Sequence, residues 1–325
     1  MKVVIPGGSG QVGGILARHF HGRGDEVTVL SREPRPAAWS VSVWDGATVG
    51  KWAAELEGTD VLINLAGRSV NCRYGAANRR EIRESRVRST LALHEAVAGL
   101  RRPPRVWINA STATIYRHAL DRPMDEVTGE LGGGEAGAPD TWNFSIEVAK
   151  GWEAAFFSRS PEGVRQVAIR SAMTMSPDSG GVFDVLLGLV RHGLGGRQGP
   201  GTQYVSWIHE RDFVRAVEWL IERDDWTGVV NVASPNPLPN REFMRELREA
   251  WGIRVGAAVP RWMLGIGAWA MRTETELILK SRRVVPGRLA AAGFRFEYPD
   301  WSGAARELVA RWRKGRTKDT RSNCR

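Results

Sequence analysis

The feature that most constrains this chain is a glycine-rich turn that directly follows a short apolar segment at residues 3–5. Gly7, Gly10 and Gly13 recur at intervals of three, in the pattern G-x-x-G-x-x-G. Gly7 permits a tight turn, Gly10 lets the backbone approach a pyrophosphate, and Gly13 lets the next helix pack close to the strand. The N–H groups that begin such a helix attract an anion. The pattern therefore predicts a dinucleotide site lined by Gly7, Gly10, Gln11, Val12 and Gly13.

Strand-like and helix-like segments alternate after this turn. We predict strands at residues 3–5, 27–30, 61–65, 105–110, 165–170 and 229–232, and helices at 11–23, 52–57, 78–98, 143–159 and 212–222. This alternation is typical of a doubly wound parallel α/β sheet of the Rossmann type. Beyond Ser234, prolines mark a linker and helices predominate, which indicates a small, mostly helical C-terminal cap.

The 325 residues are enough for one large α/β unit and a smaller cap. We expect the dinucleotide-binding domain to comprise residues 1–171 and 203–233, and the cap to comprise 172–202 and 234–310. The net charge is +10, but residues 311–325 hold seven basic residues and one acidic residue, so the remainder carries only +4. We therefore expect 311–325 to be a disordered basic tail, with no specific nucleic-acid partner.

The two cysteines, Cys72 and Cys324, lie far apart and lack the spacing of metal ligands. This usage is typical of a reduced cytoplasmic protein without a bound metal. The sequence shows no signal-peptide pattern and no apolar stretch of membrane-spanning length, so we expect no membrane partner. It leaves the oligomeric state open.

The residues after the second predicted strand indicate which dinucleotide binds. A Rossmann protein that selects NAD usually places Asp or Glu there, against the ribose 2′-hydroxyl. This chain has Ser31 and Arg32 instead. A hydroxyl followed by a guanidinium suits a 2′-phosphate, which favours NADP(H).

Two further segments resemble the short-chain dehydrogenases. Residues 64–67, Asn-Leu-Ala-Gly, resemble the Asn-Ala-Gly segment that lines the adenosine side of the cofactor in that family. Residues 111–116, Ser-Thr-Ala-Thr-Ile-Tyr, resemble the Ser-Ser-Ala-Thr-Val-Tyr segment of its extended, sugar-nucleotide-modifying branch. The resemblance implies that Thr112 polarises the substrate. It also implies that the cofactor contacts Leu65, Ala66, Gly67 and Ser111.

The chain departs from that family at the residues that transfer the proton. The family's Tyr-x-x-x-Lys pair is absent, since the residues four places after the four tyrosines are Asn78, Leu120, Ile208 and Ser302. Alignment on Glu153 puts Ser145 at the tyrosine position and Ala149 at the lysine position. A serine hydroxyl is a far poorer proton donor than a phenol whose pKa a lysine has lowered.

One subfamily shares this departure. Its members are similar to this chain over residues 144–153, 194–203, 206–212, 283–289 and 292–299. They are the epimerase-family proteins of the atypical short-chain dehydrogenase group, whose C-terminal segment is a small domain of unknown function. The resemblance implies NADP(H) binding and an epimerase name, but no established substrate.

The family pattern suggests further site residues. It places Arg86 toward the pyrophosphate or ribose, with Glu81 on the same helix, although both could form a solvated helix pair instead. It places Thr174 near the nicotinamide amide. Glu147 could act as a general base if it were buried, although surface glutamates are commoner on helices. His209 is a candidate substrate contact.

Two functions remain open from sequence. The first is an NADP-dependent epimerase or oxidoreductase that transfers hydride at a carbonyl or hydroxyl carbon of a small, sugar-nucleotide-like molecule. The second is a non-catalytic NADPH-binding protein that senses or regulates.

Overall fold

The computed structural model describes residues 1–270 and 274–322, and these divide into two units. The first comprises Met1–Ile115, Leu131–Ser171 and Val214–Asn231, and the second comprises Tyr116–Glu130, Ala172–Phe213 and Val232–Arg325. The division differs from the expected one at residues 116–130, 203–213 and 232–233, which join the second unit. The reason is strand pairing: Tyr204–Val205 and Trp207–His209 pair within the second unit and take no part in the large sheet.

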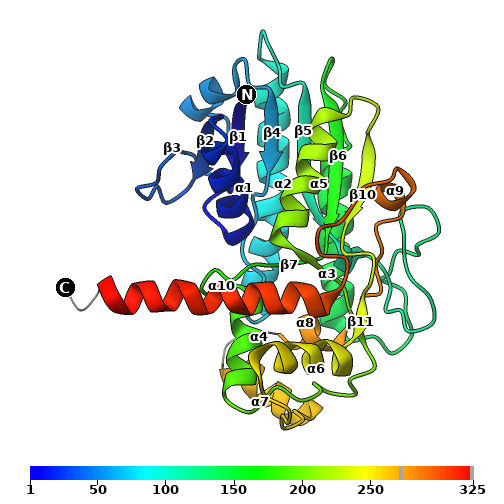
Figure 1. Cartoon of the computed structure of the whole chain (residues 1–325). Coiled ribbons are helices and arrows are strands. Elements are labelled where there is room, and N and C mark those ends of the chain that lie inside the picture. Colours follow the sequence, from blue (N-terminus) through cyan, green and yellow to red (C-terminus); the bar gives the residue numbers. More distant parts are fainter. Residues whose placement is uncertain (271–273, 323–325) are drawn as a thin grey trace. The chain divides into compact units, whose positions relative to one another are not determined.

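The first unit is built on a seven-stranded sheet among the described residues, in the order β10-β6-β5-β4-β1-β2-β3 (Figure 1). Every pairing from β3 through to β6 is parallel, which confirms the predicted doubly wound α/β fold. The strands are β1 Lys2–Pro6, β2 Glu26–Ser31, β3 Ser40–Val43, β4 Val61–Asn64, β5 Val106–Thr112, β6 Arg165–Ser171 and β10 Gly228–Val232.

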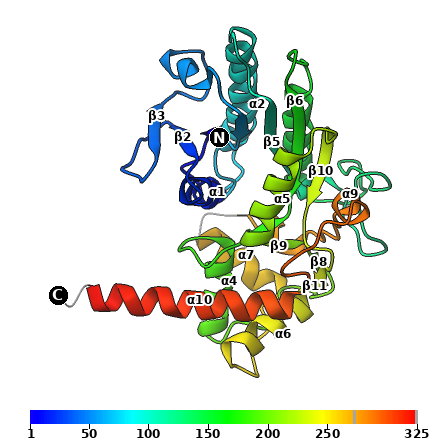
Figure 2. The same cartoon turned by 45° about the horizontal axis from the view of Figure 1, so that its top comes forward.

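The helices of this unit cover both faces of the sheet. In chain order they are α1 Gln11–Gly22, α2 Ala76–Ala98, α3 Asp140–Phe156 and α5 Glu210–Glu222, with 3₁₀ turns at Lys51–Leu56 and Ala113–Ile115. The first four residues of α5 belong to the second unit. Helices α2 and α3 pack together on one face. Helices α1 and α5 lie on the other face, where His19 Nε2 is 2.7 Å from Glu218 Oε1 (Figure 2). All four residues of β4 are buried, as a strand covered on both faces requires.

The strand order reverses direction between β1 and β4. From β1 the chain proceeds to β2 and β3 on one side, and from β4 to β5 and β6 on the other. In open α/β sheets, ligands bind beyond the carboxyl ends of the strands at such a switch point. The glycine turn after β1 lies there.

The second unit is mostly helical, as expected. It contains α4 Val182–Arg191, α6 Asn240–Trp251, α7 Arg261–Ala270, α8 Glu276–Leu279, α9 Gly287–Ala291 and α10 Trp301–Ser322, with the strand pairs β7 Met173–Met175 with β9 Trp207–His209 and β8 Tyr204–Val205 with β11 Leu238–Pro239. Its core surrounds Trp301, which stacks on Phe243 with ring centroids 4.0 Å apart and also meets Trp207. The indole N–H of Trp301 donates to the Phe243 carbonyl at 2.9 Å. Helix α10 therefore packs along α6 (Figure 2).

The expectation of a disordered tail at 311–325 is wrong, because α10 continues through Ser322. Trp312 is 7% exposed and donates to Asp184 at 2.8 Å, and Arg311 pairs with Glu210 at 2.5 Å. These contacts anchor a helix that charge composition alone predicted to be unfolded. Residues 323–325 lie outside the described residues. No helix in the described ranges combines the length and apolar character needed to cross a membrane.

Candidate functional site

The glycine turn has the geometry that its three glycines predict. Gly7 adopts a φ of 75°, and a Cβ there would lie 2.7 Å from the backbone of Ala66. A Cβ on Gly13 would lie 2.4 Å from the Cα of Gly8, so only glycine lets α1 approach the turn this closely. At Gly10 the nearest atom to such a Cβ is 3.8 Å away. The turn is therefore tight on its inner side and open at Gly10, where a ligand can approach.

The N-terminus of α1 is electrostatically uncompensated. No side chain caps the helix at Gly10, and its first turn contains no acidic residue. Gln11 adds a buried side-chain Nε2 that has no hydrogen-bond partner. The positive end of the helix dipole and an unused amide donor thus lie together beside the turn, as an anion site requires.

Ser31 lies next to this turn at the end of β2. It is 4% exposed, and its hydroxyl is 3.3 Å from the Ser9 hydroxyl and 3.0 Å from the Glu33 carbonyl oxygen. Arg32 follows with an exposed side chain. The structure therefore brings a hydroxyl and a free-standing cation to the edge of the glycine turn.

A buried amide network orders the ends of β4 and β5. Asn64 Nδ2 donates to Asn109 Oδ1 at 2.7 Å, and its own Oδ1 accepts from the Ala66 N–H at 3.1 Å. The Leu65 N–H donates to the Pro6 carbonyl at 2.8 Å, which joins this segment to β1. Leu65, Ala66 and Gly67 thereby lie at the carboxyl edge of the sheet beside the turn.

Arg86 is a partly buried cation on α2 beside Gly67. A Cβ on Gly67 would lie 3.0 Å from the guanidinium carbon of Arg86. Arg86 donates to the carbonyls of Arg68 and Ile82 and lies over the Trp152 ring. Burial lowers its pKa to about 10, and no carboxylate is among these contacts. Glu81, by contrast, is exposed and pairs with Arg68, which precedes α2, and not with Arg86 as in the alternative interpretation of a solvated helix pair.

A buried ion pair that the sequence analysis did not assign lies next to β5. Arg170 of β6 donates two hydrogen bonds to the carboxylate of Glu153 in α3, at 2.8 and 2.7 Å. The Ser111 hydroxyl donates to the same carboxylate at 2.5 Å. The sequence did contain a signal for this pair, because a basic and an acidic residue occur within a strand and a helix that are both predicted to be buried. Ser111 thus has a structural partner, and its expected cofactor contact stays a prediction.

The candidate catalytic residues of the first unit differ in exposure. Thr112 is partly buried at the end of β5, and its Oγ1 accepts from the Thr114 N–H at 3.1 Å. Glu147 is 65% exposed and lies 3.6 Å from Arg83, so a surface ion pair is what the structure provides. Lys150, one residue past the lysine position of the family, donates to the Gly132 carbonyl at 2.6 Å. Of these, Thr112 alone lies at the strand edge.

The remaining two candidates lie in the second unit. His209 is fully buried, stacks on Tyr298, and is 3.0 Å from Glu307 through Nε2, while Nδ1 accepts from the Arg211 N–H. Burial lowers its pKa despite that glutamate. These contacts favour a structural role over the predicted substrate contact. Thr174 of β7 is 6% exposed, and its hydroxyl has no partner; its cofactor contact stays a prediction.

A glycine turn at the switch point of a parallel sheet, followed by an uncapped helix, defines a Rossmann-type nucleotide-binding fold. Comparison with known proteins narrows the class. The model of the NAD dependent epimerase/dehydratase family matches residues 3–233, and residues 259–308 match a domain of unknown function, DUF1731. The chain therefore belongs to the NAD dependent epimerase/dehydratase family, which confirms the resemblance found in the sequence.

Individual relatives agree with this assignment. The chain is 32% identical to the epimerase family protein SDR39U1 of Bos taurus, over 95% of this chain and 100% of that protein. The crystal structure of human epimerase family protein SDR39U1 with NADPH superposes with a TM-score of 0.82 at 29% identity, covering 95% of this chain and 99% of that one. A nucleoside-diphosphate sugar epimerase from Corynebacterium glutamicum gives 0.71 at 28% identity, covering 95% of this chain and 58% of that one.

Proposed function

We propose that this protein binds NADP(H) at the glycine turn of its first unit and transfers hydride at a carbonyl or hydroxyl carbon of a small molecule. The observation that carries the proposal is the pairing of an uncapped α1 N-terminus with Ser31 and Arg32 at the end of β2. The helix end suits the pyrophosphate, and the hydroxyl with the guanidinium suits a 2′-phosphate. The human relative crystallised with NADPH supports this choice of cofactor.

Arg86 adds a partly buried positive charge to the proposed site. Its contacts are two backbone carbonyls and the Trp152 ring, so its charge is available to an anion beside Gly67. Burial has already lowered its pKa to about 10, and a bound phosphate or ribose oxygen would stabilise the charged form.

When bound, the nicotinamide supplies or accepts the hydride. The role of the chain is to orient the reacting carbon without a Tyr-x-x-x-Lys pair. The oxygen of Thr112 accepts from the Thr114 N–H, which leaves the hydroxyl hydrogen able to donate to a substrate carbonyl. Ser145 and Ala149 offer no phenol and no ammonium at the family's proton-transfer positions.

Cofactor choice is tested by titrating the protein with NADPH and NADH. We expect NADPH to bind at least tenfold more tightly, about 1.4 kcal/mol, and Arg32→Asp to remove the difference. Arg35→Asp is the matched control, because the Arg35 side chain is 80% exposed. Its ion pair with Glu33, at 3.6 Å, is exposed as well. Equal or tighter binding of NADH to the unaltered protein would contradict the proposal.

The proposed hydride transfer is tested by following NADPH oxidation in the presence of each member of a panel of carbonyl compounds that includes nucleotide sugars. We expect Thr112→Val to lower kcat at least tenfold while NADPH affinity stays within a factor of two. Loss of NADPH affinity in this variant would show that Thr112 serves the cofactor. NADPH binding without oxidation by any member of the panel would favour the second candidate, a non-catalytic NADPH-binding protein.

A further inference from the structure

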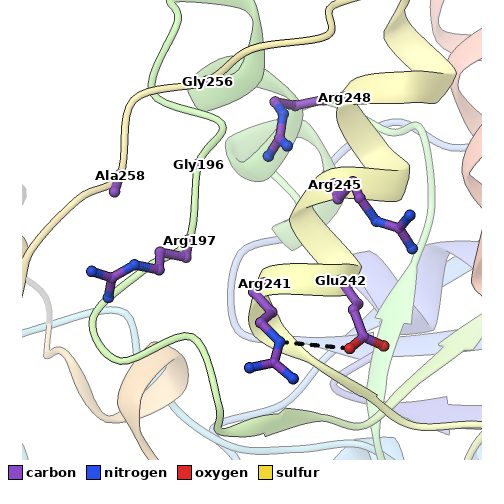
Figure 3. A pocket seen from close by; sticks show the side chains of 8 residues that line it. All are labelled: Gly196, Arg197, Arg241, Glu242, Arg245, Arg248, Gly256 and Ala258. Carbon is purple, nitrogen blue, oxygen red and sulfur yellow. Dashed lines mark ion pairs between the residues drawn. The ribbon is translucent and has the colours of Figure 1, made fainter.

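The second unit contains a pocket whose lining is dominated by arginine. The pocket has a volume of about 450 Å³, within the usual range for small-molecule sites. Arg241, Arg245 and Arg248 line it from successive turns of one face of α6, and Arg197 lines it from the segment opposite (Figure 3). Glu242 is the one acidic residue in the lining. The pocket is separate from the glycine turn, since all of its lining residues belong to the second unit.

The wall opposite α6 is rigidly built. The Gly196 N–H donates to the Ala257 carbonyl at 3.0 Å, and the Val259 N–H donates to the Arg197 carbonyl at 2.9 Å. A Cβ on Gly196 would lie 2.4 Å from the Ala257 oxygen. Two segments far apart in the sequence are thus held in backbone contact, and the pocket keeps its shape without a ligand.

Arg248 is fixed between these segments. Its Nη1 donates to the Gly195 carbonyl at 2.5 Å, and a Cβ on Gly256 would lie 2.7 Å from the Arg248 Cδ. Its Nε is buried and has no hydrogen-bond partner. A buried donor without a partner costs free energy, so a ligand atom that accepts from it would be stabilised.

The charge of the pocket is poorly neutralised. Glu242 lies 3.6 Å from Arg241, and the two other carboxylates near the rim, Glu246 and Glu249, lie 3.7 and 3.9 Å from Arg245. All three contacts are long, and those of Glu242 and Glu249 are also exposed, so their energetic value is small. Arg197 donates to the Gly199 carbonyl and has no carboxylate among its contacts given by the structure.

We propose that this pocket binds a small soluble molecule that carries two or more phosphate groups. Four arginines and one carboxylate line the pocket, so the lining is net positive and suits a multivalent anion. Planar guanidinium groups match phosphate oxygens through paired hydrogen bonds. A pocket of this volume accommodates a small molecule. The proposal does not depend on the chemistry assigned to the first unit.

The test is calorimetric titration of the full chain, saturated with NADPH, with inorganic pyrophosphate at about 150 mM salt, where non-specific attraction is screened. We expect a dissociation constant below about 1 mM and at least tenfold weaker binding to Arg241→Gln/Arg245→Gln. The matched control is Arg254→Gln, an equal change of charge at an exposed arginine outside the pocket lining. Absence of binding, or equal weakening in the control, would overturn the proposal.

Two further measurements sharpen the result. Arg248→Lys keeps the charge but removes Nε, together with the Nη1 that donates to the Gly195 carbonyl, and we expect at least fivefold weaker pyrophosphate binding. Unchanged affinity in this variant would count against the pocket. Cosedimentation with vesicles containing anionic phospholipid distinguishes a membrane ligand: arginine-dependent vesicle binding without pyrophosphate binding would refute a soluble ligand.

Discussion

Arg170 and Glu153 form a salt bridge whose side chains are 8% and 11% exposed, between a strand and a helix of the first unit. The pair takes both charges out of water, and Ser111 adds a third group to the same carboxylate. Removal of one partner from such a pair leaves a buried charge uncompensated, which destabilises far more than loss of a surface pair. The network therefore fixes the end of β5, where Thr112 lies.

We expect Glu153→Gln to lower the free energy of unfolding by about 3–5 kcal/mol, because it removes the carboxylate that neutralises the charge of the Arg170 guanidinium. Urea denaturation followed by circular dichroism measures the change. Glu147→Gln is the matched control on the same helix, since its exposed contact with Arg83 should contribute less than about 1 kcal/mol. Similar losses in the two variants would show that burial does not decide the strength of the Arg170 pair.

At the scale of elements, the turn between β1 and α1 depends on close backbone approach, and adjacent glycines of the turn and helix differ in that respect. A Cβ on Gly13 would lie 2.4 Å from the Cα of Gly8, whereas a Cβ on Gly14 would meet only the end of the Arg18 side chain, at 3.7 Å. Two substitutions of the same kind at neighbouring positions should therefore have opposite effects.

We expect Gly13→Ala to cost about 1–3 kcal/mol in unfolding free energy and to weaken NADPH binding, because α1 must move away from the turn. Gly14→Ala should leave binding unchanged and stabilise the chain by up to about 1 kcal/mol, since alanine favours helix over glycine. Thermal unfolding with and without NADPH measures both. A stable, tightly binding Gly13→Ala protein would contradict the close packing described for the turn.

Helix α10 is the element for which sequence and structure disagree most. Its first half belongs to the core of the second unit through Ala304, Ala305 and Leu308, and Trp312 extends that packing. Arg316 lies over the Trp312 ring, with its guanidinium carbon 4.5 Å from the centroid. The stabilising contacts therefore reach into the segment that composition predicted to be disordered.

Two truncations separate these contributions. Removal of everything after Arg313 should cost less than about 1 kcal/mol, since it deletes an exposed cation–π contact and keeps Trp312. Removal of everything after Ala310 should cost about 3–5 kcal/mol, because it also deletes a nearly buried tryptophan. Urea midpoints of the two proteins measure this difference, and equal midpoints would show that Trp312 contributes nothing.

For the molecule as a whole, buried histidines make stability depend on pH. His94 Nε2 donates to the Phe156 carbonyl at 2.8 Å, while Nδ1 is buried without a partner. Burial lowers the pKa of His94 in the folded protein. The unfolded chain accepts the proton near the ordinary value of about 6.5, and the folded protein resists it.

The stability contributed by neutral His94 is therefore complete above about pH 6.5 and is lost as the pH falls below that value. We expect the urea midpoint to fall between pH 7.5 and pH 5.5, and to fall less in His94→Gln, which keeps a donor for the Phe156 carbonyl. Titration over this range avoids most carboxylates, whose ordinary pKa values lie below it. An identical pH dependence in the variant would assign the effect elsewhere, for instance to His209.

The sequence by itself determined the class of the fold and the position of the glycine turn. Both are local properties: period and apolar runs mark strands and helices, and the spacing of Gly7, Gly10 and Gly13 is read within seven residues. The same reasoning missed β3, whose residues 40–43 are half-exposed at the sheet edge and show no buried run. It also missed α4, because a glycine-rich stretch begins at Gly188 within that helix.

Only the tertiary structure decided which polar residues meet. Asn64 with Asn109, Glu153 with Arg170, and Arg248 of α6 with the Gly195 carbonyl are joined across 17 to 53 residues of sequence. It also decided that His209 is enclosed and Glu147 is exposed, although both had been candidate site residues from the sequence. The physical reason is that burial and pairing depend on packing between distant elements, which no local pattern of residues encodes.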